Sequence, residues 1–142
     1  VFYAVQHAQG SVMTLEEYKE FGLPNDLDVL EPAQGLWCNL LHLHGQEVYF
    51  PLLSYLRFPI VNWHDRETFP SLKEAQGLYS GVVCGGMRQD SLVYGDQAAV
   101  REEAADAIQQ TDGKRFILGT GCVVPVIASH GNLMAARESV KG

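Results

Sequence analysis

The sequence predicts an α/β fold whose centre is a parallel β-sheet. Five segments rich in β-branched, aromatic or leucine residues alternate with segments that carry helix caps and helical apolar spacing. Such an alternation requires parallel strands, because each helix returns the chain to the edge where the next strand begins. The 142 residues are enough for one domain with its own core, so we predict a single domain over residues 1–142.

The first strand and the helices after it follow from local signals. Residues 1–8 are rich in β-branched and aromatic side chains and predict a strand. Hydroxyl residues then precede a helix over residues 15–21, which has acidic side chains in its first turn. A glycine and a proline interrupt this helix, and we expect a second helical piece over residues 26–31.

The second strand is an apolar run over residues 36–43, whose length and leucine content are typical of a buried strand. Side chains alternate between the two faces of a strand, so Cys38, Leu40, His42 and His44 share one face. Two imidazoles therefore finish the strand on the same side. Ligands of barrels and doubly wound folds lie at this end of the strands.

The remaining elements continue the alternation. Ser71 and Asn132 are expected N-caps, and glycines follow the fourth and fifth strands. A polar run over residues 64–67 forms the loop after the third strand. In chain order we predict a helix over 48–56, a strand over 59–63, a helix over 72–76, a strand over 80–84, a helix over 97–110, a strand over 116–122 and a helix over 133–140.

Composition limits the functions that this chain can have. The net charge is −7 and no basic run occurs, so we expect no nucleic-acid partner. No apolar stretch reaches the roughly 20 residues of a membrane span, so we expect no membrane partner. The cysteines Cys38, Cys84 and Cys122 are odd in number and lie in apolar runs, which favours reduced thiols in a cytoplasmic protein. A strand begins at Val1 without a lead-in, so we expect an incomplete chain.

Two folds agree with five βα units. They make about five eighths of a (β/α)8 TIM-type barrel, which usually takes about 250 residues. They equally match a complete doubly wound domain of flavodoxin-like type. The sequence has no glycine-rich loop of the dinucleotide-binding kind, which disfavours a nucleotide-binding function.

Several short motifs, taken in order, resemble the uroporphyrinogen decarboxylase superfamily. They lie at residues 1–8, 41–45, 61–63, 83–86 and 117–125, followed by Asn132-Leu133. The resemblance implies the C-terminal part of a (β/α)8 barrel, with strands four to eight present and the first three missing. It implies two kinds of activity: cofactor-free porphyrinogen decarboxylation, and zinc-dependent methyl transfer with corrinoid proteins and thiols. The missing N-terminal half of the barrel, or a second copy of the chain, is then an expected partner.

The methyltransferase branch implies a zinc site. The resemblance to that branch implies a His-x-Cys pair, followed about eighty residues later by a lone cysteine, as the zinc ligands. Here His42 matches the histidine, Cys122 matches the late cysteine, and His44 stands where the first cysteine would be. Zinc accepts imidazole as readily as thiolate, so these three side chains form a chemically sound set with a fourth position open. Without a metal, the two histidines would be an ordinary hydrogen-bonded pair at a strand end.

The decarboxylase branch matches less well. The resemblance to that branch implies a histidine beside the glycine that ends the last strand. That glycine is Gly121, and no histidine adjoins it. Gln6 stands where the decarboxylases carry a serine, and Asn62 where an acid is common. Five residues are predicted to bind the substrate. The resemblance favours Gln6 at the end of the first strand. The others lie at strand ends or in the loop after the third strand: Asn62, His64, Arg66 and Cys84.

The sequence therefore predicts an enzyme segment with zinc-assisted, methyltransferase-like activity. The methyl group would pass to a thiol from a corrinoid or another methylated donor. The alternatives are a metal-free porphyrinogen decarboxylase acting on a tetrapyrrole, and a catalytically silent barrel fragment.

Overall fold

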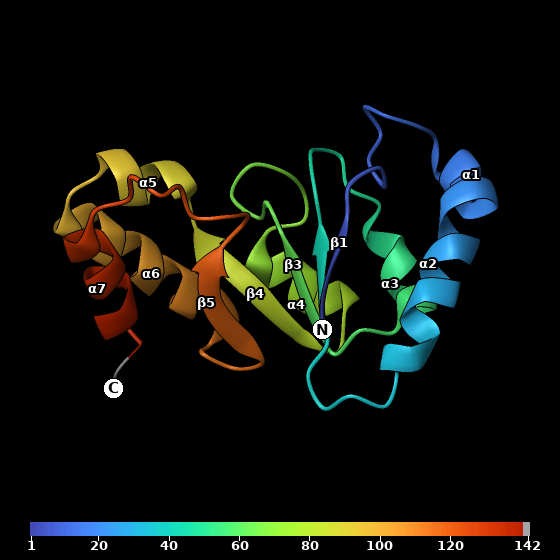
Figure 1. Cartoon of the computed structure of the whole chain (residues 1–142). Helices are drawn as coiled ribbons and strands as arrows, with labels where there is room; N and C mark the ends of the chain where they lie inside the picture. The colour runs from blue at the N-terminus through green and yellow to red at the C-terminus, as the bar shows by residue number, and fades with distance from the viewer. Residues whose placement is uncertain (141–142) are drawn as a thin grey trace.

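A computed structural model describes residues 1–140, and a parallel sheet of five strands lies at its centre (Figure 1). The strands are Phe2–Val5 (β1), Leu40–Leu43 (β2), Ile60–Trp63 (β3), Val82–Met87 (β4) and Phe116–Thr120 (β5). The α-helices are Leu15–Glu17 (α1), Leu23–Leu30 (α2), Leu53–Leu56 (α3), Leu72–Leu78 (α4), Gln89–Tyr94 (α5), Gln97–Thr111 (α6) and His130–Glu138 (α7). A π-helical segment, Tyr18–Gly22 (η1), and two 3-10 segments, Glu31–Ala33 (η2) and Phe50–Leu52 (η3), adjoin them.

The order of the strands distinguishes the two predicted folds. Each strand pairs in parallel with the next strand in the sequence, giving the order β1-β2-β3-β4-β5. A doubly wound sheet reverses its order at a switch point, whereas the wall of a (β/α)8 barrel adds each strand beside the previous one. The sheet is therefore five strands of a (β/α)8-type barrel, and the predicted fold class is confirmed.

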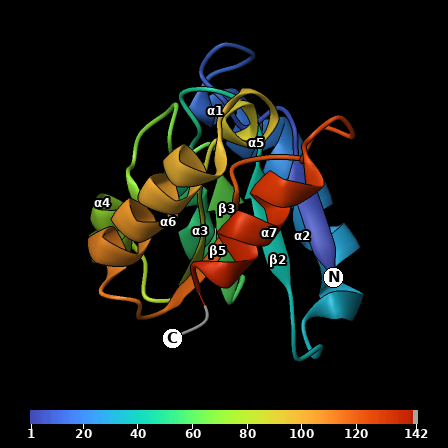
Figure 2. The same cartoon turned by 90° about the vertical axis from the view of Figure 1, so that its left-hand side faces the viewer.

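The two faces of the sheet differ in composition because side chains alternate along each strand. Leu41, Leu43, Val61 and Trp63 are fully buried on the face that the helices cover. The other face carries His42, Asn62 and Cys84 and borders a pocket. Figure 2, turned by 90°, shows α6 and α7 packed beside each other in front of the sheet. The face with the polar side chains corresponds to the inside of a barrel.

The predicted boundaries of the first half change at several points. The first strand covers Phe2–Val5 rather than residues 1–8. The second strand begins at Leu40 rather than at residue 36, because Leu36 and Trp37 are exposed in a loop. Residues 15–30 form one continuous helical path, in which η1 absorbs the predicted break between two helices. The predicted helix over 48–56 begins at Phe50 as a 3-10 turn.

The second half differs from the prediction in where its strands and helices begin and end. The fourth strand continues through Gly85-Gly86 to Met87, and the short helix α5 follows where we predicted none. The last helix begins at His130 with Ser129 as its N-cap. Asn132, the predicted cap, instead directs its side chain to the carbonyl oxygens of Leu92 and Gly95. Within residues 1–140, no helix is both long and apolar enough to span a bilayer.

We expect a polypeptide of these 142 residues, produced alone, to self-associate. In the described part of the chain, β1 and β5 each have one strand neighbour, and Phe2 on β1 is 63% exposed. Unpaired strand edges with apolar side chains are templates for association. Light scattering should show species larger than a monomer, and Phe2→Lys should reduce them because an edge charge opposes pairing. A stable monomer at high concentration would contradict this expectation.

Candidate metal centre

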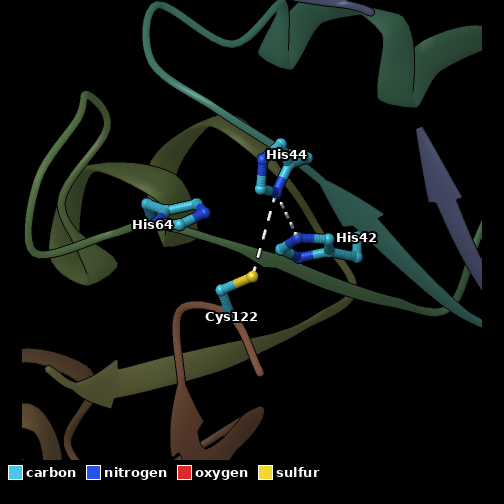
Figure 3. A group of neighbouring side chains, drawn as sticks. All are labelled: His42, His44, His64 and Cys122. Atoms are coloured by element: carbon cyan, nitrogen blue, oxygen red, sulfur yellow. Dashed lines mark hydrogen bonds between the residues drawn. The ribbon is translucent and has the colours of Figure 1, made fainter. Parts of the chain in front are cut away.

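Three strands deliver a histidine or a cysteine to the same edge of the sheet. The strands are parallel, so their C-terminal ends lie together and the side chains that finish them converge. The four side chains are His42 in β2, His44 directly after it, His64 directly after β3, and Cys122 just after β5. Figure 3 shows them turned toward one another. Each offers one ligand atom, and these four atoms lie within 4.8 Å of one another.

His44 is the centre of this group. Its Nδ1 atom lies 3.4 Å from Nε2 of His42 and 3.8 Å from Sγ of Cys122. The rings of His44 and His64 meet edge to face, with their centroids 5.3 Å apart. Donor atoms around a tetrahedral zinc ion lie about 3.3–3.6 Å apart, given its usual bond lengths. The two measured distances are close to this range.

The side-chain amide of Asn62 sets the tautomer of His42. Its Nδ2 atom donates hydrogen bonds of 2.9 Å to the carbonyl oxygens of Cys84 and Thr120. The amide oxygen therefore faces Nδ1 of His42, at 2.7 Å, and can only accept. His42 thus carries its hydrogen on Nδ1 and presents the lone pair of Nε2 to the group.

Burial favours the neutral form of the His42 imidazole. Loss of hydration lowers its pKa, and the neighbouring imidazoles of His44 and His64 lower it further, against the raising effect of the bond to Asn62. Only a neutral imidazole binds a metal ion. A metal ligand usually has its second ring nitrogen hydrogen-bonded to an acceptor, and Asn62 supplies that acceptor here.

His64 has the same arrangement with a different outer partner. Its Nδ1 atom lies 3.4 Å from the carboxylate of Glu67. Its Nε2 atom is buried and has no hydrogen-bond partner among residues 1–140. A buried polar atom without a partner is costly, so its presence calls for a ligand. This atom, beside two further imidazoles and a thiol, shows that the residues present fit a metal ion.

A close backbone contact brings Cys122 to the group. A Cβ atom on Gly121 would lie 2.8 Å from Cα of His64 and 2.9 Å from the carbonyl oxygen of Trp63. Only glycine can lie this close to the end of β3. The chain leaving β5 therefore lies directly against His64, and the next residue is Cys122.

The donor set selects among metals. Three imidazoles and one thiol suit zinc, which binds nitrogen and sulfur ligands in tetrahedral sites. The three ligands predicted from the sequence, His42, His44 and Cys122, lie together in this group, and His64 joins them. Their role as ligands of an ion remains a prediction.

Comparison with known proteins adds to this geometry. A family model described as uroporphyrinogen decarboxylase (URO-D) matches residues 2–142. The chain belongs to the uroporphyrinogen decarboxylase family. Among solved structures, a methyltransferase from Methanosarcina mazei is similar, with a TM-score of 0.79 and 17% sequence identity. The match covers 97% of this chain and 40% of the methyltransferase chain. No curated protein matched the chain closely enough to count as a relative.

In this member of the uroporphyrinogen decarboxylase family, the histidine and cysteine group borders a pocket of about 530 Å³. Three residues predicted to bind substrate, Gln6, Asn62 and Cys84, line this pocket. Burial raises the pKa of the Cys84 thiol to about 11, and the carboxylate of Asp65 adds to the shift. Cys84 therefore remains a protonated thiol at neutral pH, unlike a metal-bound cysteine.

The other two predicted substrate residues have different surroundings. His64 lies in the histidine and cysteine group rather than in the lining of this pocket. Arg66 directs its Nε atom to the carbonyl oxygen of Gly86 and its Nη2 atom to that of Glu103, and its Nη1 atom pairs with Asp106. Binding of the substrate by Arg66 stays a prediction, and these contacts already occupy its three nitrogen atoms.

Sequence reasoning missed His64 as a possible ligand. We predicted that it belongs to a polar loop over residues 64–67, because it begins a run of four ionisable side chains. The signal that could have found it is its place directly after a strand, as for His44. Two histidines that follow neighbouring parallel strands meet at the same edge of the sheet.

We expect Gly121→Ala to destabilise the protein by about 1–3 kcal/mol, since the added methyl group would overlap the backbone of β3. The matched control is Gly77→Ala in α4, where a Cβ atom would meet nothing within 4 Å. That substitution should raise stability by about 0.5–1 kcal/mol, because alanine is the better helix former. Urea unfolding of the full-length protein measures both. Equal stability of the two variants would contradict the close contact.

Proposed function

We propose that these residues form the metal-binding part of a zinc-assisted methyltransferase that transfers a methyl group to a thiol. The observation that carries the proposal is the convergence of three imidazoles and one thiol at the barrel mouth. The structural similarity to a methyltransferase supports it. The chain spans about 40% of that methyltransferase, so the activity is proposed for the whole protein.

The proposed ligands are His42, His44 and Cys122, with His64 as a further candidate. A substrate thiol would take the place of His64 or would enter as a fifth ligand, since catalytic zinc can expand to five ligands. When bound, zinc supplies a positive charge that lowers the pKa of a coordinated thiol and holds it as the nucleophilic thiolate. The protein's own residues orient the donors. Asn62 fixes the tautomer of His42, and Glu67 faces the outer nitrogen of His64.

The pocket beside the ligands is the proposed place for the methyl donor and the thiol. Its lining is mostly apolar, with Phe2, Leu40, Val123 and Val124 contributing side chains. Gln6 and Cys84 offer polar groups within it. Such a lining limits water around a reactive thiolate. A corrinoid or another methylated compound is the proposed donor.

A metal-free porphyrinogen decarboxylase is the second candidate, and the family match favours it. In that case the hydrogen-bonded pair of His42 and Asn62 would face a tetrapyrrole. Thr120 and Cys122 adjoin Gly121, where the decarboxylase pattern implies a histidine. The two candidates differ in their need for a metal.

We expect the full-length protein to contain about one zinc ion per chain. His42→Ala and Cys122→Ser should each lose most of it, because either change removes a ligand while the core of the sheet is unchanged. His7→Ala and Cys38→Ser are matched controls outside the group and should keep the metal. Metal analysis after purification without chelators measures this. A zinc-free parent that takes up no added zinc would contradict the proposed site.

The zinc-loaded, full-length protein should demethylate methylcobalamin in the presence of a simple thiol such as 2-mercaptoethanol. Loss of the methylcobalamin absorbance follows the reaction. Cys122→Ser should reduce the rate to near that of the uncatalysed reaction, since the bound thiol would lose its activation. Release of carbon dioxide from a porphyrinogen by the metal-free protein, with no demethylation, would favour the second candidate.

A further inference from the structure

The loop that carries His64 is held by one glycine of the neighbouring strand. The last residue pair of β3 and β4 is Asn62 with Cys84, yet β4 continues for three more residues. Gly86 lies in this extension, where β3 offers it no further partner. Its N–H donates to both carboxylate oxygens of Asp65, at 3.0 and 3.1 Å. Its carbonyl oxygen accepts from Nε of Arg66, at 2.9 Å. The side chains of two consecutive residues thus provide the hydrogen bonds that β3 no longer provides to this part of β4.

Arg66 extends this contact to α6. Its Nη2 atom donates to the carbonyl oxygen of Glu103 at 3.0 Å, and its Nη1 atom pairs with the carboxylate of Asp106. Gly86 itself lies against α6, because a Cβ atom there would be 2.5 Å from Cβ of Ala107. Its φ of +99° is also a backbone conformation that favours glycine. The loop after β3 is therefore fixed to two elements at once.

The imidazole of His64 depends on this backbone for its position. Its Nδ1 atom lies near the carboxylate of Glu67, three residues away, whose side chain is 43% exposed. A contact of this exposed kind contributes little to holding a side chain in place. The carbonyl oxygen of His64 accepts from the amides of Glu67 and Thr68, which closes a turn. The orientation of that turn is then set by the neighbouring Asp65 and Arg66.

We propose that Asp65 and Arg66 are positioning residues, which grip Gly86 and α6 and thereby hold His64 against His44 and Cys122. This inference rests on the proposed function, because the purpose of the held imidazole is to bind the metal. Outer groups that orient metal ligands change metal affinity by about 10- to 100-fold when they are removed. Arginine suits this role because its planar guanidinium can reach several acceptors in fixed directions.

The test compares Arg66→Met with Arg101→Met in the full-length protein. Arg101 is a matched control, since it also joins a carboxylate and a backbone carbonyl, those of Glu138 and Ala135, between α6 and α7. The first readout needs no metal: the rate at which diethylpyrocarbonate modifies His64 in the metal-free protein, followed by peptide mass spectrometry. The second is the affinity for cobalt(II) and its visible absorption spectrum.

Arg66→Met should increase the modification rate of His64 several-fold, weaken cobalt binding by about 10- to 100-fold and alter the spectrum. Arg101→Met should leave all three unchanged. Asp106→Ala removes one contact of Arg66 from an exposed helical position and should give smaller changes in the same direction, even if Arg66→Met folds poorly. Thermal melting of each variant separates a general loss of stability from a local effect.

Two other outcomes separate a failure of the positioning role from a failure of the proposed metal site. If the parent binds cobalt and neither Arg66→Met nor Asp106→Ala changes the modification rate, the affinity or the spectrum, the positioning role is wrong and the metal site stands. If the parent binds no metal, the proposed function fails. The modification rate of His64 then still decides whether Arg66 positions it.

Discussion

The side chain of Asn62 is the constraint on which the inner face of the sheet depends. It lies in the middle strand, is 5% exposed, and bonds to one residue in or beside each of β2, β4 and β5. A buried amide of this kind is costly unless it is hydrogen-bonded, and both of its polar atoms are used here. It therefore specifies how the strand ends lie relative to one another. The lone pair of His42 points to the other donors because this amide leaves it no alternative.

The same strand serves both layers of the fold. Asn62 faces the pocket, and the next residue, Trp63, faces the helices, where its Nε1 atom donates to the carbonyl oxygen of Pro70. Its ring meets that of Phe50 edge to face. A shift of β3 by one residue would exchange these two side chains and expose the indole to the pocket. The fully buried Trp63 thus protects the register that Asn62 needs.

Much of this could be predicted from the sequence, because periodicity and chain order carry the information. The alternation of elements predicted the parallel sheet, and same-face spacing together with the family resemblance grouped His42 and His44 with Cys122. Contacts between side chains and segments that are separated in the sequence were not predictable. The apolar Leu36 and Trp37 resemble a strand, yet they are exposed in a loop, across which Asn39 donates to the carbonyl oxygen of Ala33.

The helix ends show the same limit. Asparagine is a common helix cap, so Asn132 resembles one. Its actual partners are Leu92 on α5 and Gly95 after α5, which are 40 and 37 residues away in the sequence. The side chain is 4% exposed and serves the packing of α5 against α7 instead. His64 likewise resembles part of a solvated charge run until the backbone of Gly121 is placed against it. In each case the deciding contact joins segments that local sequence patterns cannot relate.

The distance along the chain between the proposed ligands has a consequence for folding. His44 and Cys122 are 78 positions apart, and three strands lie between them in the sequence. An ion bound to both would close a loop of that length, as a disulfide would. Closing such a loop in a flexible chain costs about 4 kcal/mol of entropy by the logarithmic rule. In the folded sheet the two ends of this loop are already held together, so binding of the ion does not require that entropy loss again. Metal affinity would therefore depend on how well the five strands are assembled. The ion would act as a reversible cross-link across more than half of the chain.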